Sequence, residues 1–305
     1  MKRIRKIALI FSLTMFIMLV FSSCSKQTVD TSKFNIVTSF YPMYIATANI
    51  VDGVEDVELV NLTEVTTGCL HDYQLTTANM VTLSTADALV INGGGMESFI
   101  EKAADTYKTL EIIDASKGIL ESHTHEHEEE HDGHNHGANA HIWVSISMHI
   151  KQIENIKNEL VKLDSKNAEK YAENANNYIS KLERLKQEMH EKLVNIEDKQ
   201  IITFHEAFEF FAEEYGLKIA AVIEREPGTY PSAGEVAKII DLVRSKDIKA
   251  IFVEPQYSRS AADTIARETK VKVYTLDPIV TGNLNKEAYI ELMRNNMNAL
   301  EEALK

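Results

Sequence analysis

The sequence has few basic residues relative to acidic ones, and this shortage excludes one large class of function. It carries 32 Lys and Arg against 46 Asp and Glu, for a formal net charge of −14 with histidine counted as neutral. A nucleic-acid-binding protein needs a basic surface to meet phosphates, so this charge argues against DNA or RNA as a partner. The chain also lacks the GxGxxG and GxxxxGK[ST] patterns, so no nucleotide site is indicated.

The longest apolar run is shorter than the roughly 20 residues that a membrane-spanning helix needs. This run, Ile7 to Phe21, follows the basic segment MKRIRK and precedes Ser-Ser-Cys, which ends at Cys24. The order matches a secretory signal peptide, and small residues before a cysteine resemble a bacterial lipobox. By that resemblance Cys24 becomes the lipidated first residue of the mature protein and anchors it to the cell membrane. The alternative is an uncleaved membrane anchor, and in either case the globular part faces outward.

Cysteine is nearly absent, since Cys24 and Cys69 are the only two. If Cys24 carries lipid, Cys69 has no partner and the chain forms no intrachain disulfide. Stability must then come from packing, and the apolar fraction of 44% with a charged fraction of 26% is typical of a globular protein. A chain of 305 residues is long enough for about two domains.

Eight short β-rich runs alternate with helical patterns along the rest of the chain. Four lie in the first half, FNIVTSF, VELVNL, ADALVING and TLEIID, and four in the second, KQIITF, KIAAVI, IKAIFVEP and VKVYTLDP. Nearly continuous apolar strands separated by helices are typical of parallel sheets that are covered on both faces. We therefore expect an α/β protein with two βα lobes, each built on a small parallel sheet.

A segment without glycine or proline, Ser165 to Lys199, separates the two halves. Its apolar residues recur at spacings of three and four, which predicts one long amphipathic helix that joins the lobes rigidly. These residues are Tyr171, Ala175, Tyr178, Leu182, Leu185, Met189 and Leu193. The predicted organisation is a signal peptide (1–23), a tether (24–33), an N-terminal lobe (34–164), the linking helix (165–199) and a C-terminal lobe (200–305).

The most unusual stretch of the chain is ESHTHEHEEEHDGHNHG at residues 121–137, here called the histidine run. The simplest interpretation is a solvated acidic loop, but a histidine-rich tract indicates metal binding. We expect a surface loop of the first lobe whose affinity for Zn²⁺ is low, because ordering it costs roughly 1–2 kcal/mol per fixed residue. Its candidate auxiliary ligands are His123, His125, His127, His131, His134 and His136.

Three other histidines and one carboxylate stand at the ends of predicted elements. His71 follows the turn-like TTGCL, His141 enters HIWVS, which has the composition of a strand, and His205 ends the run QIITF. Asp277 also follows an apolar strand. Parallel sheets place ligands at the carboxyl ends of their strands, so these side chains could converge, two from each lobe. Three imidazoles and one carboxylate are a donor set that tetrahedral zinc accepts.

Other polar patterns carry weaker signals. His149 and His190 lie on helical faces among Lys, Glu and Gln, and we expect both to be solvated. The phrase HEAFE at 205–209 resembles the zinc-protease motif HExxH, but Glu209 stands where the second histidine belongs, so we expect no enzyme. Cys69 could bind zinc as a thiolate, but we expect it to pack as a small apolar residue.

Three phrases resemble the metal-binding lipoproteins of ABC importers: FHEAFEFFAEEYGL, EREPGTYPSAGEVAKIIDLVRSKDIKAIFVEPQYS and IARETKVKVYTLDP. More narrowly, from about Phe34 to the C-terminus, the chain is similar to the zinc-specific substrate-binding proteins that carry a histidine-rich loop. The resemblance implies two lobes joined by one long helix, with the metal in the cleft between them. It assigns the ligand positions to His71, His141 and His205, and the fourth, a carboxylate or solvent position, to Asp277.

The resemblance also implies a function. We expect an extracytoplasmic, lipid-anchored monomer that captures Zn²⁺ and delivers it to the membrane permease of an ABC importer. Zinc binding needs neutral imidazoles, so the affinity for zinc should decrease steeply as the pH drops below the ordinary histidine pKa of about 6.5. A manganese- or iron-binding importer component and a metal-binding surface adhesin remain alternatives. His205 is the discriminator for the metal, because a carboxylate there would favour the harder ions.

Two departures from the family pattern concern the predicted ligands. Leu70 stands where a proline usually precedes the first histidine, and Asn139 and Ala140 replace the usual Asp–Pro pair before the second. Loss of the aspartate could remove a partner that orients the ring of His141. For the histidine run we expect a role in gathering scarce zinc for the main site, with buffering or sensing at high zinc as the alternative.

Overall fold

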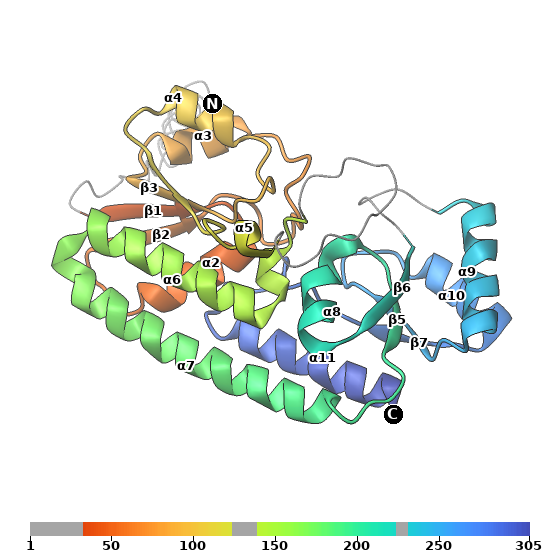
Figure 1. The fold of residues 1–305 in the computed structure, drawn as a ribbon. Coiled ribbons are helices and arrows are strands. Elements are labelled where there is room, and N and C mark those ends of the chain that lie inside the picture. The colour runs from red at the N-terminus through yellow and green to blue at the C-terminus, as the bar shows by residue number, and fades with distance from the viewer. Residues whose placement is uncertain (1–32, 124–138, 224–230) are drawn as a thin grey trace, which may run out of the picture. The chain divides into compact units, whose positions relative to one another are not determined.

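The computed structural model describes residues 33–123, 139–223 and 231–305, and Lys33 to Lys305 form one compact unit. Strands and helices alternate along it, as Figure 1 shows. The strands of the described residues all fall within the predicted β-rich runs. They are β1 (Phe34–Thr38), β2 (Val57–Asn61), β3 (Ala88–Ile91), β4 (Glu111–Asp114), β5 (Gln200–Thr203), β6 (Lys218–Val222), β7 (Ala250–Val253) and β8 (Lys272–Thr275).

The strands form two four-stranded sheets with the same topology. Their orders are β2-β1-β3-β4 and β6-β5-β7-β8, and every pairing is parallel. β3 and β7 are buried along their whole length, as expected for strands covered on both faces. The predicted α/β fold with two lobes is therefore confirmed. In each sheet the order of strand addition reverses between the central strands, β1 and β3 or β5 and β7, and the carboxyl ends at such a switch point are where open α/β sheets bind ligands.

Helices cover both sheets. In the first lobe they are α2 (Tyr41–Ile50), α3 (Thr77–Leu83), α4 (Ile100–Thr106), α5 (Leu120–His123) and α6 (Ile146–Leu163). In the second they are α8 (Glu209–Tyr215), α9 (Ala233–Lys246), α10 (Ser260–Thr269) and α11 (Ala288–Leu304). Three short 3₁₀ turns are η1 (Ile142–Val144), η2 (Ser165–Asn167) and η3 (Glu206–Phe208). The expected extended structure at HIWVS is wrong, because η1 turns there to bury Trp143 and Ser145 caps the start of α6.

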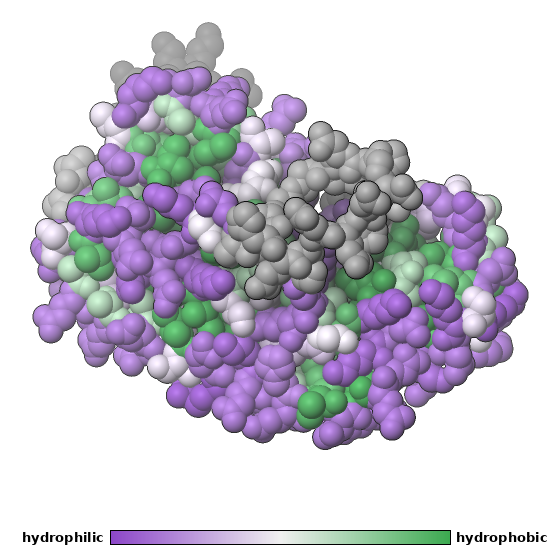
Figure 2. Space-filling model, in the orientation of Figure 1, coloured by the Kyte–Doolittle hydropathy of each residue, from purple (hydrophilic) through white to green (hydrophobic). Residues whose placement is uncertain are grey.

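The predicted linking helix is present as α7 (Ala168–Leu193), a continuous helix of 26 residues. Its buried residues are the same seven apolar residues whose spacing predicted the helix. It is shorter than the predicted segment, because η2 precedes it and a turn follows Leu193. In Figure 1 it runs along the lower side of the picture, from below the first sheet to below α8 and α11, and Figure 2 shows mostly hydrophilic residues on that side. The exact boundaries of the two lobes stay a prediction.

The last helix, α11, returns from the second lobe and packs against α7 and α2. Ion pairs of Lys181 with Glu287 and of Lys192 with Glu301 show that α11 runs parallel to α7. One hydrophobic cluster consequently contains buried residues of both sheets and of α2, α6, α7 and α11. The lobes are thus joined by a shared core as well as by α7.

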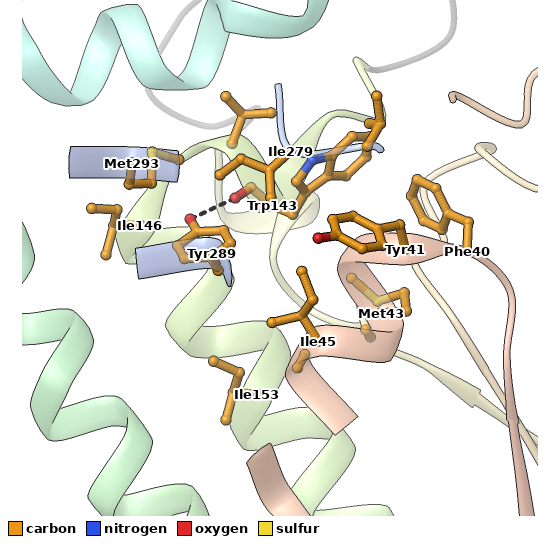
Figure 3. Packing of buried hydrophobic residues seen from close by; sticks show 14 of the residues in the cluster. Phe40, Tyr41, Met43, Ile45, Trp143, Ile146, Ile153, Ile279, Tyr289 and Met293 are labelled. Carbon is orange, nitrogen blue, oxygen red and sulfur yellow. Dashed lines mark hydrogen bonds between the residues drawn. The ribbon is translucent and has the colours of Figure 1, made fainter. Parts of the chain in front are cut away.

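Trp143 belongs to this shared core, where Figure 3 shows it between Tyr41 of α2 and Tyr289 of α11. Its indole Nε1 donates a hydrogen bond to the carbonyl oxygen of Pro278 at 2.7 Å. Its own carbonyl accepts one from the hydroxyl of Tyr289 on α11 at 2.8 Å. Trp143, two positions after His141, is therefore fixed by two hydrogen bonds to the second lobe, and these hold η1 in place.

No helix within the three described ranges is both long and apolar enough to cross a membrane. The predicted signal peptide and Cys24 lie outside the described residues.

Candidate metal centre

The three predicted histidine ligands come together where the two lobes meet. His71 lies in a turn ahead of α3, His141 directly precedes η1, and His205 follows β5 and precedes η3. The ring centroids of His141 and His205 are 4.9 Å apart, and that of His71 lies 5.2 Å from His141 and 6.5 Å from His205. We call these three residues the histidine cluster. His141 and His205 are each only 3% exposed, so the cluster is mostly shielded from water.

The distance between the two buried rings suits one bound cation. The Nε2 atoms of His141 and His205 lie 3.1 Å apart. A tetrahedral zinc with Zn–N bonds of roughly 2.0–2.1 Å separates two nitrogen ligands by about 3.3 Å. Burial lowers the pKa of His141 well below its ordinary value, and His205 and His71 lower it further. The neutral imidazole, which is the form that binds metal, is therefore favoured there at neutral pH.

Asn139 orients the ring of His141. Its Oδ1 accepts a hydrogen bond from the backbone N–H of His141 at 3.0 Å and lies 2.7 Å from the ring Nδ1. Its Nδ2 donates to the carbonyl of Glu206 at 2.9 Å and to Oε2 of Glu209 at 2.8 Å. Because both partners of Nδ2 are acceptors, the amide has one consistent orientation. His141 must then carry its proton on Nδ1, which leaves the Nε2 lone pair facing His205. The amide thus fills the place of the missing aspartate.

The first sheet holds the backbone next to His141. Asn92, at the carboxyl end of β3, donates from Nδ2 to the carbonyl of Ala140 at 2.8 Å and accepts from Nε2 of Gln152 at 2.8 Å. The buried carboxylate of Glu97 accepts from the backbone N–H of Asn92 at 2.8 Å and from the hydroxyl of Ser39 at 2.7 Å. Burial raises the pKa of Glu97 to about 7. This network ties the segment before His141 to the switch point of the first sheet.

Cys69 faces the cluster more closely than the sequence suggested. It packs against the main core as expected, but its Sγ also lies 3.5 Å from Nε2 of His141. Donor atoms of Cys69, His141 and His205 all lie within 4.8 Å of one another. In the part of the chain that the structure describes, this is the only set of three such close donors from His, Cys, Asp or Glu.

The place of the fourth ligand is less defined. Asp277 follows β8, an edge strand, and its carboxylate accepts a hydrogen bond from the N–H of Ile279 at 2.7 Å, while burial raises its pKa. It belongs to no set of three close donors among the described residues. Glu254 follows the central strand β7, is 2% exposed, and its charge acts on the thiol of Cys69. Glu254 was not among the predicted ligands, although in IFVEP it follows an apolar strand, the same pattern that selected His205.

The other histidines divide into three groups. His149 is fully buried and stacks on Tyr289 with ring centroids 4.3 Å apart, so the expectation that it is solvated is wrong. His190 is exposed, as expected. In the histidine run, the backbone of His123 ends α5, and the remaining five histidines lie outside the described residues. A strict HExxH pattern does occur in that undescribed part, at 127–131.

Two βα lobes, with imidazoles from both of them facing one another at 3.1 Å, define a two-lobed metal-binding protein. The sequence matches the family described as "Zinc-uptake complex component A periplasmic" over residues 36–303. The chain therefore belongs to this family, and the resemblance noted from its motifs is confirmed. The proteins of this family are extracytoplasmic transport components, so the prediction that the chain is not an enzyme is also confirmed.

Curated relatives match along most of the chain. The high-affinity zinc uptake system protein ZnuA of Bacillus subtilis is 34% identical, and the match covers 93% of this chain and 92% of that protein. The zinc-binding lipoprotein AdcA of Streptococcus pneumoniae is 31% identical over 98% of this chain, which spans 61% of that longer protein. The manganese-binding lipoprotein MntA of Halalkalibacterium halodurans is 25% identical over 95% of this chain and 96% of its own.

Solved structures show the same fold. The metal-dependent lipoprotein YcdH of Bacillus subtilis superposes with a TM-score of 0.74 at 30% identity, covering 90% of this chain and 100% of that one. The binding protein FpvC of Pseudomonas aeruginosa, solved with Mn²⁺, gives 0.76 at 29% identity, covering 89% and 98%. The laminin-binding protein Lmb of Streptococcus agalactiae, described as an adhesin with metal-transporting activity, gives 0.76 at 25% identity, covering 89% and 100%.

Proposed function

We propose that this protein captures Zn²⁺ at the histidine cluster outside the cytoplasm and delivers it to the permease of an ABC importer. The observation that carries the proposal is the 3.1 Å separation of the Nε2 atoms of His141 and His205, one from each lobe. A cation bound between them is held by both lobes at once, so binding favours one arrangement of the lobes that a permease can recognise. The relatives named for zinc uptake and zinc binding support the choice of metal.

The donor atoms support zinc on chemical grounds. Imidazole nitrogen is a ligand of intermediate softness that suits zinc, whereas manganese favours carboxylate, carbonyl and water oxygens. His71, His141 and His205 supply up to three such nitrogens, and Asp277 is the fourth ligand that the family pattern proposes. Glu254 offers a second buried carboxylate at the end of the neighbouring strand.

A competition titration tests this function. The protein without residues 121–137 is titrated with Zn²⁺ and with Mn²⁺ against a chromophoric chelator, alongside His205→Ala in the same background. We expect one tight zinc site, weaker manganese binding, and loss of the tight site in His205→Ala. His190→Ala is the matched control, because His190 is exposed and lies on α7, which carries none of the three cluster histidines. Absence of a tight zinc site without the histidine run would move the binding element into that run and refute the proposal.

Manganese is the second candidate cargo. The relative MntA and the structure of FpvC with Mn²⁺ show that proteins similar to this one are named for, or bind, that ion. The same titration separates the two cargoes. A manganese carrier would bind Mn²⁺ tightly in the presence of the chelator, and the change His205→Ala would reduce its affinity for metal less. An adhesive role, which the laminin-binding neighbour combines with metal transport, is compatible with either cargo.

Lipid on Cys24 is the proposed membrane anchor. The signal-like segment and the Ser-Ser-Cys sequence at 22–24 support it, and the relative AdcA is named a lipoprotein. Cells that express the protein with Cys24→Ser should release it from the membrane fraction and fail to label it with a fatty-acid probe. Unchanged labelling of that variant would contradict the anchor.

The histidine run is proposed to gather scarce zinc and pass it to the histidine cluster. Its six imidazoles on one short segment would bind zinc weakly and exchange it fast, beside a tighter and slower site. Deletion of residues 121–137 should slow zinc uptake under limitation while leaving the tight site intact. Equal uptake by the deletion strain would refute this role and favour buffering at high zinc.

A further inference from the structure

The proposed function leaves the thiol of Cys69 without a role. Cys69 is the free cysteine of the described residues, and its Sγ lies 3.5 Å from the Nε2 of His141. We propose that Cys69 is itself a ligand of the transported metal, so that a sulfur joins the imidazole nitrogens and makes the site selective for soft ions of the zinc class. This inference rests on the proposed function and specifies its ligand set, with Cys69 in the fourth position in place of Asp277.

The distances fit a single ion bound by sulfur and nitrogen together. A tetrahedral zinc with a Zn–S bond of about 2.3 Å and Zn–N bonds of roughly 2.0–2.1 Å places sulfur about 3.5 Å from each nitrogen. The observed separation of the Cys69 Sγ and the His141 Nε2 is 3.5 Å, and that of the His141 and His205 Nε2 atoms is 3.1 Å. Two edges of the expected tetrahedron are therefore nearly formed before any metal binds.

The chain around Cys69 is built to present it. Gly68 has a φ of 82°, in the left-handed region that glycine adopts readily, and this turns the backbone immediately ahead of Cys69. Leu70 is fully buried and its N–H contacts the Sδ of Met96 at 3.4 Å, which anchors the segment in the first lobe. Cys69 and His71 flank this anchor and both face His141. One fixed segment thus carries both Cys69, whose sulfur belongs to the set of close donors, and His71, whose ring centroid lies 5.2 Å from that of His141.

The proton balance is simple. An ordinary cysteine thiol carries its proton at neutral pH, and burial, followed by the charge of Glu254, raises the pKa of Cys69. On binding, the S–H bond breaks, a sulfur–metal bond forms, and the proton leaves to solvent without any change of oxidation state. The thiolate and the neutral imidazoles then leave a single positive charge on a zinc complex, and Glu254 lies near enough to act on it.

A sulfur ligand has a direct consequence for selectivity. Thiolates bind zinc and other soft ions strongly and manganese poorly, while imidazoles discriminate less between them. Cys69 would therefore separate this chain from a manganese carrier of the same fold, a distinction that the histidines alone make less sharply.

Cobalt(II) is the probe that tests the ligand directly. Residues 33–305 form one compact unit with its own hydrophobic cores, and Cys69 is the only cysteine they contain. This fragment is loaded with one equivalent of Co²⁺, and the absorption spectrum of the wild type is compared with that of Cys69→Ser. We expect a near-ultraviolet sulfur-to-cobalt charge-transfer band in the wild type, its absence in Cys69→Ser, and visible bands of a nitrogen-bound cobalt in both.

Competition titrations with Zn²⁺ and Mn²⁺ supply the second readout. Cys69→Ser should weaken zinc binding by at least 10-fold and change manganese binding much less. Loss of a group that only supports a metal ligand already costs roughly 10-fold or more in affinity. Cys69→Ala, which removes the donor and keeps a small apolar side chain, should behave alike, and circular dichroism checks that both variants fold.

The outcomes separate this inference from the proposed function. A missing charge-transfer band in the wild type, or an unchanged zinc-to-manganese ratio in Cys69→Ser, would overturn Cys69 as a ligand. If His205→Ala still abolishes tight zinc binding in that case, the zinc-carrier function stands without the sulfur. If the wild type shows no tight zinc site at all, both proposals fail.

Discussion

At the scale of single residues, Asn139 shows why an amide differs from the carboxylate that the family usually has before its second histidine. Its oxygen serves His141 and its nitrogen donates to Glu206 and Glu209 across the junction of the lobes. An aspartate could serve His141 in the same way, but it has no hydrogen to donate. It would also place a second negative charge against Glu209. The asparagine therefore couples the orientation of a proposed ligand to contact between the lobes.

Removing this side chain should weaken metal binding without removing a ligand. We expect Asn139→Ala to lower zinc affinity by roughly 10–100-fold, because the ring of His141 loses the group that fixes its proton on Nδ1. Asn139→Asp should keep that contact but repel Glu209, and the added change Glu209→Gln should restore much of the affinity. Competition titrations of the four proteins form a double-mutant cycle. Independent effects of the two changes would show that the contact with Glu209 does not matter for binding.

A second residue-scale feature is the buried His149, whose environment predicts a pH-dependent stability. Burial lowers its pKa to about 4, and its Nδ1 lies 3.2 Å from the Oε1 of Gln152. The unfolded chain has a histidine pKa of about 6.5, so between these values it binds a proton that the folded protein does not. Stability is therefore complete above about pH 6.5 and falls as the pH drops toward 4.

Urea unfolding of the metal-free protein at neutral pH and at about pH 5 measures this effect. Protonation of His149 in the unfolded chain should lower the free energy of unfolding by about 2 kcal/mol between the two conditions. The free energy of unfolding of His149→Gln should therefore fall by about 2 kcal/mol less than that of the wild type. His190→Gln is the control, because it makes the same change at a histidine that is exposed. Equal pH dependence in His149→Gln and the wild type would contradict the argument.

At the scale of elements, α7 and α11 do more than connect. α7 buries one apolar face, and α11, from the end of the chain, packs beside it and against α2 of the first lobe. Since the main hydrophobic cluster includes both sheets, damage to α7 should be felt by both lobes. A flexible hinge would instead let each lobe unfold on its own.

Leu185 provides the test, because it lies in the middle of α7 and is fully buried. Leu185→Ala should lower the free energy of unfolding by about 2–5 kcal/mol through the lost contacts and the cavity left behind. The neighbouring Arg184 is exposed, so Arg184→Ala should change the free energy of unfolding by about 0.5 kcal/mol or less. Far-UV circular dichroism and Trp143 fluorescence should report one shared transition in urea. Two separate transitions would show that the lobes are independent.

At the scale of the whole molecule, two places are proposed to bind metal, the histidine cluster and the histidine run. The chain has one tryptophan, Trp143, and its ring centroid lies 5.3 Å from that of His141. It is fully buried in the shared core. Its fluorescence is therefore a local reporter of the cluster.

We expect one equivalent of Zn²⁺ to change the Trp143 fluorescence, and Co²⁺ to quench it, in the wild type and in the protein without residues 121–137 alike. His141→Ala should abolish the tight phase of the change, while His190→Ala should leave it intact. A response that disappears with the histidine run would place the tight site there instead. The pH dependence of the same signal should show weakening as imidazoles of the cluster protonate, beginning lower than for exposed histidines because burial lowers the pKa of His141.

The strands and the long helix could be predicted because each depends on a local pattern. Strand and helix periodicities report which faces are buried, and the apolar positions of α7 are the buried ones. The rule that ligands follow parallel strands found His205, and applied more widely it would have found Glu254. The family motifs add His71 and His141 to the same site.

Only the tertiary structure decided which side chains meet across the junction of the lobes. Cys69 and His141 are 72 positions apart in the chain, and Asn139 lies 67 and 70 positions before its partners Glu206 and Glu209. His149 and Tyr289, which stack, are 140 positions apart, and no local periodicity encodes such pairs. HIWVS has the composition of a strand, yet Trp143 is drawn into a core shared with α11 and the segment coils into η1. Burial in that shared core, rather than local propensity, determined these features, because it depends on how distant elements pack together.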